Sequence, residues 1–219
     1  MQKKHLLFFY FLLSSFFSVF AQLSSKHYIP PITTSDPIAN QIIYISTPSS
    51  ANISFTITPI GGTPTNYVTS NDSPFAYEIF NSSNGGNNSQ LHQLNSDTNT
   101  VIDDKGFIIE STEGLLSVSV RVRRALIAGF GQVHAGALVS KGLSALGREF
   151  RVGGFIPEVS GGNRLNFVSV MATENNTNIT FNIPSGTNLL NGSTTTGPVS
   201  INLDEKQTYI MAVGGNSSN

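Results

Sequence analysis

Histidine is the residue type best suited to bind a metal ion or to move a proton near neutral pH. The chain has four histidines, His5, His27, His92 and His134. Zinc sites usually place two ligands within a few residues of each other, and these histidines are far apart in the sequence. We therefore interpret them as ordinary polar positions and predict no metal or cofactor site.

Two adjacent carboxylates, Asp103 and Asp104, could bind Ca²⁺ together with Asp97 and Asn99. Calcium favours such oxygen ligands, but known calcium loops also carry a glycine at the turn and a distal glutamate. The segment around Asp97 has neither feature. A solvated turn is therefore the favoured interpretation.

Glycoside hydrolysis requires two facing carboxylates, and Glu149 and Glu158 are the pair considered for it. Nothing in their sequence surroundings would raise the pKa of one above that of the other. No serine lies in a Gly-x-Ser-x-Gly nucleophile motif, and the absence of cysteine excludes a thiolate nucleophile. The sequence therefore does not predict an enzyme.

Arginines form the remaining group with binding chemistry. Arg121 and Arg123 share one face of a predicted strand, Arg124 is adjacent, and Arg148 and Arg151 follow later. Guanidinium groups can bind acidic glycans through paired hydrogen bonds. The favoured interpretation is a solvent-facing sheet surface whose charge limits edge-to-edge aggregation.

Alternating apolar and polar residues form the elements that would position these side chains. Charged residues make up only 11%, whereas the chain has 28 Ser, 19 Thr and 21 Asn. Period-two alternation with β-branched residues predicts half-buried antiparallel strands. The runs are 43–47, 53–57, 118–122, 167–173, 179–183 and 209–213. We predict an all-β fold of antiparallel β-sandwich-like modules, with a turn at 48–52 and one helical turn near 143–146.

The N-terminus has the layout of a secretory signal peptide. Lys3 and Lys4 precede an apolar stretch, and Val19 and Ala21 stand at positions −3 and −1 of a cleavage site before Gln22. A transmembrane anchor is the alternative, but it needs about 20 apolar residues and this stretch contains three serines. We predict removal of residues 1–21, export, and an extended lead-in over residues 22–40.

An internal repeat appears when the sequence is shifted by 126 positions. Residues 45–57 then lie over residues 171–183. Five positions match: Thr47, Asn52, Ile53, Phe55 and Ile57 with Thr173, Asn178, Ile179, Phe181 and Ile183. Duplication is favoured over chance similarity. It predicts a first β unit over residues 41–160 and the start of a second over 161–219, as expected of a fragment.

Three segments resemble one known family. Residues 105–111 resemble a Lys-Gly-x-Ile-x-Ser block, and residues 138–150 resemble its Lys-Gly-x-x-Ala-Leu-Gly companion. Residues 168–183 resemble the element that follows. Together they resemble the N-terminal domain family named for an IgG Fc-binding protein. In bacteria, such domains occur mostly in large secreted or cell-surface proteins of the Bacteroidetes. The resemblance implies an extracellular location, but it does not carry immunoglobulin binding over to this chain.

These observations favour a non-catalytic exported module of an adhesin-like cell-surface protein. Its expected partner is an extracellular protein or glycan, contacted through the polar loops 81–89 and 186–198. The alternative is a carbohydrate-binding or accessory module of a secreted hydrolase, with Tyr28 or Tyr67 stacking on sugars. A nucleic-acid partner is not expected, because 12 basic residues stand against 13 acidic ones. No segment after the signal peptide is apolar enough to span a membrane.

Overall fold

The computed structural model describes residues 22–34, 38–86, 89–124, 135–152 and 165–214. Its only helical elements there are two 3₁₀ turns, η2 (Asn95–Asp97) and η3 (Gly142–Ala145). The strands are β1 (Lys26–Ile29), β2 (Ile38–Ser46), β3 (Ile53–Pro59), β4 (Thr65–Thr69), β5 (Phe75–Gly86), β6 (Val101–Ile102), β7 (Phe107–Glu110), β8 (Ser117–Arg124), β9 (Ala135–Ser140), β10 (Leu165–Met171), β11 (Thr177–Phe181), β12 (Val199–Leu203) and β13 (Thr208–Gly214). The strands pair antiparallel within four sheets, which confirms the predicted all-β class.

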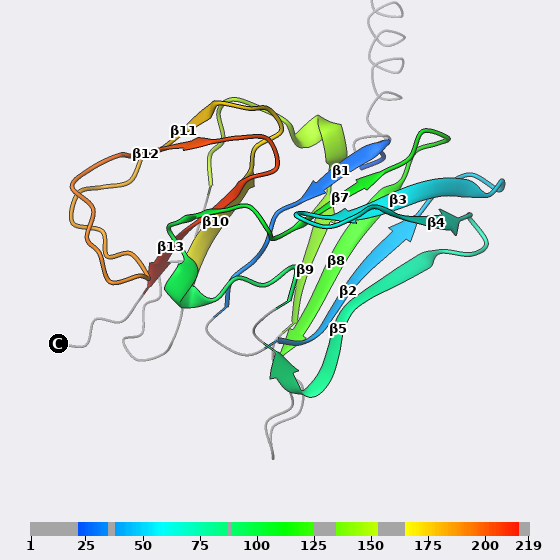
Figure 1. Ribbon diagram of the computed structural model, residues 1–219, viewed down its shortest axis with the longest axis horizontal. Helices are drawn as coiled ribbons and strands as arrows, with labels where there is room; N and C mark the ends of the chain where they lie inside the picture. Colours follow the sequence, from blue (N-terminus) through cyan, green and yellow to red (C-terminus); the bar gives the residue numbers. More distant parts are fainter. Residues whose placement is uncertain (1–21, 35–37, 87–88, 125–134, 153–164, 215–219) are drawn as a thin grey trace, which may run out of the picture.

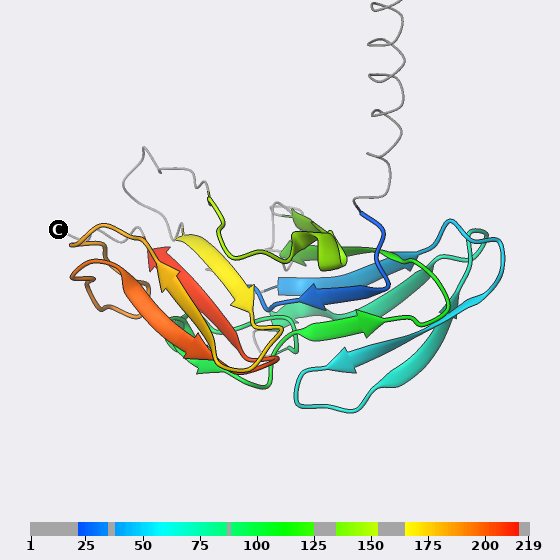
Figure 2. The same ribbon diagram turned by 90° about the horizontal axis from the view of Figure 1, so that it is seen from above.

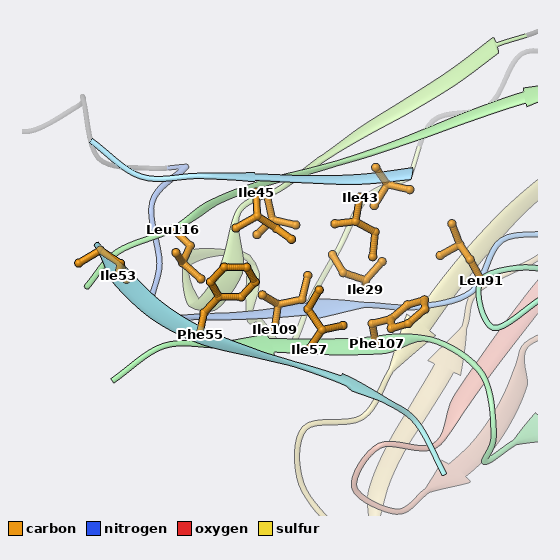
Figure 3. Packing of buried hydrophobic residues seen from close by; sticks show 12 residues of the cluster. Ile29, Ile43, Ile45, Ile53, Phe55, Ile57, Leu91, Phe107, Ile109 and Leu116 are labelled. Carbon is orange, nitrogen blue, oxygen red and sulfur yellow. The ribbon is translucent and has the colours of Figure 1, made fainter. Parts of the chain in front are cut away.

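Two four-stranded sheets make the first part of the molecule (Figure 1). One has the strand order β1-β7-β3-β4 and the other the order β5-β2-β8-β9. Apolar side chains from both sheets meet in one core between the two layers (Figure 3). Its buried members are Ile29, Ile43, Ile45, Ile53, Phe55, Ile57, Leu91, Phe107, Ile109, Leu116, Val118 and Val120. The arrangement is a β-sandwich.

The predicted alternation places side chains on the expected faces. Ile43 and Ile45 of β2 are buried, whereas Tyr44 between them is 44% exposed. Every other residue of a strand points to the same side of its sheet, so a period-two sequence fills one core. On β8 the same rule buries Val118 and exposes Arg121.

The segment 48–52 connects the two sheets rather than two strands of one hairpin. β2 pairs with β5 and β8, whereas β3 pairs with β4 and β7. The strands on either side of the predicted turn at 48–52 therefore do not pair with each other. The strands pack face to face across the core, so both apolar sets still point inward.

Aromatic rings line the side of the sandwich where β4 lies opposite β5. The ring centroids of Tyr67 and Phe75 are 4.7 Å apart, and that of Phe55 lies 5.6 Å from Phe75. Tyr77 continues the cluster toward Phe107 at 5.9 Å. Burial and the neighbouring Tyr67 raise the pKa of the Tyr77 phenol, so it stays protonated within this cluster.

The second part of the molecule repeats two of the strand pairings of the first. β10 pairs with β13 while the two strands between them, β11 and β12, pair with each other. In the same way, β2 pairs with β5 while β3 pairs with β4. Figures 1 and 2 show this second set beside the first sandwich. Its core contains Ala172, Leu203, Tyr209 and Met211.

The first strands of the two sets differ in which residues face the core. Val170 and Ala172 pack in the second core, although the 126-residue shift places them over Tyr44 and Ser46, between the core residues of β2. The later strands agree, because Ile179 and Phe181 face the second core as Ile53 and Phe55 face the first. The gap-free alignment therefore holds for β11 but not for β10.

Several segments predicted as connections take part in sheets. β1 lies in the predicted lead-in and pairs with β7, and β5 continues to Gly86 because Ile38 of β2 lies opposite that residue. β6 comes from the predicted first unit but pairs with β13 in the second set. The helical turn near 143–146 is η3. Residues 1–21, including Ala21 of the predicted cleavage site, and residues 125–134 lie outside the described residues.

Candidate functional site

One exposed face of the first sandwich carries the two arginines singled out from the sequence. Arg121 and Arg123 lie on β8 and point away from the core, as the alternation predicts. Arg148 and Arg151 are exposed in the segment after η3, apart from the strand. Arg121 and Arg123 therefore belong to a surface on a rigid sheet, which holds side chains more precisely than a loop does.

Strand register shows which residues surround Arg121. Ile42 of β2 lies between Arg121 of β8 and Glu78 of β5. In the next row of the same face, Tyr44 lies between Ala76 and Ser119. Val139 of β9, 44% exposed, lies opposite Ser119.

We call this surface the Tyr44 face and define it by Ile42, Tyr44, Ser119, Arg121 and Val139. Small neighbours leave the Tyr44 ring open to solvent at 44% exposure. A ring face can stack on an apolar or sugar surface, and a guanidinium can pair with a carboxylate. Sequence analysis found the arginine but not Tyr44, whose exposure depends on the small residues of the neighbouring strands.

A buried histidine and serine form the second candidate. His27 of β1 is fully buried, and its Nδ1 lies 2.9 Å from the hydroxyl oxygen of Ser140 at the end of β9. Its Nε2 lies 2.9 Å from the carbonyl oxygen of Leu116 and 3.2 Å from that of Ser24. Carbonyl oxygens only accept hydrogen bonds, so Nε2 carries the proton and the Ser140 hydroxyl donates to Nδ1.

The His27–Ser140 pair resembles the nucleophile and base of a hydrolase in composition only. Ser140 is 8% exposed and also accepts a hydrogen bond from the backbone N–H of Gly142. Burial lowers the pKa of His27, although the carbonyls of Leu116 and Ser24 oppose that shift. A nucleophile must reach its substrate, so we assign this pair to holding β1 against β9.

Gly142 makes the close approach beside this pair possible. Its φ is +55°, and a Cβ placed on it would lie 2.2 Å from the Cβ of Ser24. We expect Gly142→Ala to lower the melting temperature clearly, because both the backbone and the neighbouring chain would have to shift. Gly186→Ala is the matched control, since its φ is +84° but no atom lies within 4 Å of the added methyl group. Equal destabilisation in thermal melts would show that crowding at Gly142 is unimportant.

The acidic candidates do not assemble into one site. Within the described residues, no group of three or more His, Asp or Glu side chains could hold a metal ion. Asp97 ends η2, where its side chain accepts a hydrogen bond from Ser96 and its carbonyl accepts one from Thr100. Asp103 and Asp104 are exposed.

The other acidic and histidine candidates are described only in part. Glu149 is exposed, whereas Glu158, His5 and His134 lie outside the described residues. His92 is 2% exposed, and its backbone N–H donates to the Ser89 hydroxyl at 3.1 Å.

Glu113, which the sequence did not single out, accepts a hydrogen bond from the backbone N–H of Ser54 at 2.7 Å. That bond lowers the pKa of its carboxyl group. This contact holds the connection between β7 and β8 over the start of β3.

The two tyrosines considered as sugar platforms are not open rings. Tyr67 packs among Phe55, Phe75 and Tyr77 at the edge of the core. Tyr28 has the ammonium group of Lys26 5.5 Å from its ring centroid. An aromatic platform on the described surface is better provided by Tyr44.

The loop 186–198 is held by its own hydrogen bonds. The backbone N–H of Gly186 donates to Thr195 at 2.7 Å, and that of Leu189 donates to Ser193 at 2.8 Å. Leu189 also packs against the second core. Residues 191–194 at its tip are all exposed, as are Gly186, Asn188, Thr196 and Pro198, so much of the loop is accessible for contacts. Of the other predicted loop, 81–89, residues 87–88 lie outside the described residues.

Comparison with known proteins adds no relative to this geometry. The chain matches no protein-family model, no curated protein and no solved structure. Among the described residues, no helix is long and apolar enough to cross a membrane.

Proposed function

We propose that the chain is an exported, non-catalytic module of an adhesin-like cell-surface protein, and that it contacts its extracellular partner through the Tyr44 face. The observation that carries this proposal is Tyr44 itself. It is a 44% exposed aromatic ring in the middle of a central strand, with Arg121 in the neighbouring row. Val139 on the same face is also 44% exposed, and neighbouring apolar side chains left in water are typical of a contact surface.

The sequence supports the extracellular part of the proposal. Residues 1–21 have the layout of a signal peptide, and the segments 105–111 and 138–150 resemble those of IgG Fc-binding N-terminal domains. The family resemblance remains part of the proposal. A sandwich without cysteine fits it because the apolar core, rather than disulfides, holds the fold.

A carbohydrate-binding role is the second candidate, because the same residues suit an acidic glycan. The Tyr44 ring would stack on a sugar, and the Arg121 guanidinium would pair with a uronate carboxylate. Both roles use the Tyr44 face, so they are distinguished by whether the ligand is a protein or a glycan.

Binding to the polyuronate alginate and to a panel of extracellular matrix proteins tests the proposal. We expect Tyr44→Ala and Arg121→Ala each to weaken binding about tenfold or more, since exposed Tyr and Arg dominate contact energies. Arg148→Ala is the control, because Arg148 is also exposed but lies in the segment after η3 rather than on the sheet. Binding that is unchanged in both face variants, or equally weakened by Arg148→Ala, would contradict the assignment.

A further inference from the structure

The two sets of strands differ in whether the outer edges of their first two strands pair with a further strand. In the first set, β8 pairs with the second edge of β2, and β7 pairs with the second edge of β3. β10 and β11 hold the corresponding places in the second set. Within the described residues, each is the last strand of its sheet, in the orders β10-β13-β6 and β11-β12.

Burial shows the consequence of the two open edges. Ile53, Phe55 and Ile57 of β3 are 7%, 2% and 1% exposed. The residues that correspond to them, Ile179, Phe181 and Ile183, face the second core but are only partly buried.

The second core is less completely buried than the first, and its partly buried residues come mainly from β10, β11 and β12. Tyr209 and Met211 of β13 are 3% and 4% exposed, because β13 has a strand on each side. Val170 of β10 and Ile179 of β11 are only partly buried. Partly buried apolar side chains thus lie beside strand edges that have no strand partner within the described residues, a combination that favours pairing with a further strand.

We infer that the edges of β10 and β11 form an acceptor site for two extended strands of a further polypeptide segment. The first sandwich shows the chemistry of that segment. β7 and β8 present the inward-facing residues Phe107, Ile109, Val118 and Val120, while their backbones pair with the edges of β3 and β2. The acceptor would bind by the same combination of backbone pairing and alternate apolar side chains.

A second copy of the chain cannot supply this segment without unfolding. Its own β7 already pairs with β1 and β3, and its own β8 with β2 and β9. The inference therefore commits to a separate segment with the alternation of β7 and β8. It does not depend on the Tyr44 face, which lies on the first sandwich.

A synthetic peptide with the sequence of residues 105–124 is the probe. We expect it to bind the full chain saturably in fluorescence anisotropy, and to slow amide hydrogen exchange in β10 and β11 about tenfold or more. A peptide of the same composition with the alternation removed is the control and should not bind.

A matched pair of variants locates the site. Ile179→Ser removes an inward-facing apolar side chain of β11 and should weaken peptide binding. Asn178→Ser changes the exposed neighbour and should leave it unchanged. Because Ile179→Ser could loosen the second core, exchange in β2 and β3 is followed in parallel to show that the first sandwich stays folded.

A fusion of the peptide segment to the chain makes the test independent of the affinity of the free peptide. We expect the same segment, joined after residue 219 by a flexible linker of about 20 residues, to raise the melting temperature of the full chain. The control carries the rearranged segment on the same linker.

Four results would overturn the inference. The first is that the peptide shows no saturable binding and the fusion has an unchanged melting temperature. The second is that the rearranged peptide binds equally well, and the third is that the peptide protects only β2 and β3 from exchange. The fourth is that the chain forms a concentration-dependent dimer that protects β10 and β11 without peptide. The third would mean that the peptide replaces the chain's own β7 and β8. The fourth would make a second copy the occupant.

Discussion

Phe55→Ala is expected to lower the free energy of unfolding by about 3–5 kcal/mol, the range for truncating a buried phenylalanine. Phe55 is 2% exposed and lies between the two sheets. Its ring contacts Tyr67 and Phe75, so truncation removes the centre of the aromatic cluster as well as apolar burial. Urea denaturation followed by tyrosine fluorescence measures the change.

Val68→Thr is the control for this prediction. Val68 is 50% exposed on β4, and threonine keeps the branched side chain that strands favour. We expect a change within about 0.5 kcal/mol, as for most surface substitutions. If Phe55→Ala were as mild as Val68→Thr, the sandwich core described here would be wrong.

His27→Ala is expected to have the second-largest effect. The fully buried His27 side chain joins β1 to Ser140 and to the Leu116 carbonyl by hydrogen bonds. Its removal leaves the Ser140 hydroxyl proton without its acceptor, at a cost of roughly 1–3 kcal/mol. The Leu116 and Ser24 carbonyls each lose one hydrogen bond but keep a backbone N–H donor. His27→Gln should be milder, because the amide keeps an N–H donor for the carbonyl. Urea midpoints at pH 7.5 compare the two variants with the wild type.

The same histidine makes stability depend on pH. Burial lowers the pKa of His27 below its ordinary 6.5, so the unfolded chain binds more protons than the fold as the pH falls through that value. Stability is therefore full above about pH 6.5 and decreases until the pH reaches the folded pKa, below which this contribution no longer changes.

Urea midpoints at pH 7.5 and pH 5.5 test this dependence. The wild type should lose more stability between the two values than His27→Gln, whose amide does not titrate. The carboxyl of Glu113 does not interfere, because its lowered pKa places its titration at more acidic pH. Equal losses in the two proteins would show that His27 is not buried in its neutral form.

Alternation predicted the faces of the strands but not their partners. Ile43 and Ile53 were correctly assigned to a core, since the face of a residue follows from its local period. Whether their strands share a sheet depends on long-range pairing, and the short connection 48–52 crosses between sheets instead. β6, with two residues, is too short to show any period.

The sequence predicted only part of the candidate site, because the rest also depends on long-range contacts. Arg121 and Arg123 follow from the period of one strand. The role of His27 depends on Ser140 and Leu116, which are 113 and 89 positions away in the chain. The exposure of Tyr44 depends on Ala76 and Ser119 in two other strands.

Amide hydrogen exchange of the full chain, followed by mass spectrometry, tests most directly whether one sandwich is complete and its repeat is open along one side. We expect the slowest exchange in β2, β3, β7 and β8. Exchange should be clearly faster in β10 and β11, whose outer edges have no strand partner among the described residues. Protection of β10 and β11 equal to that of β2 and β3, without any added peptide, would contradict the account.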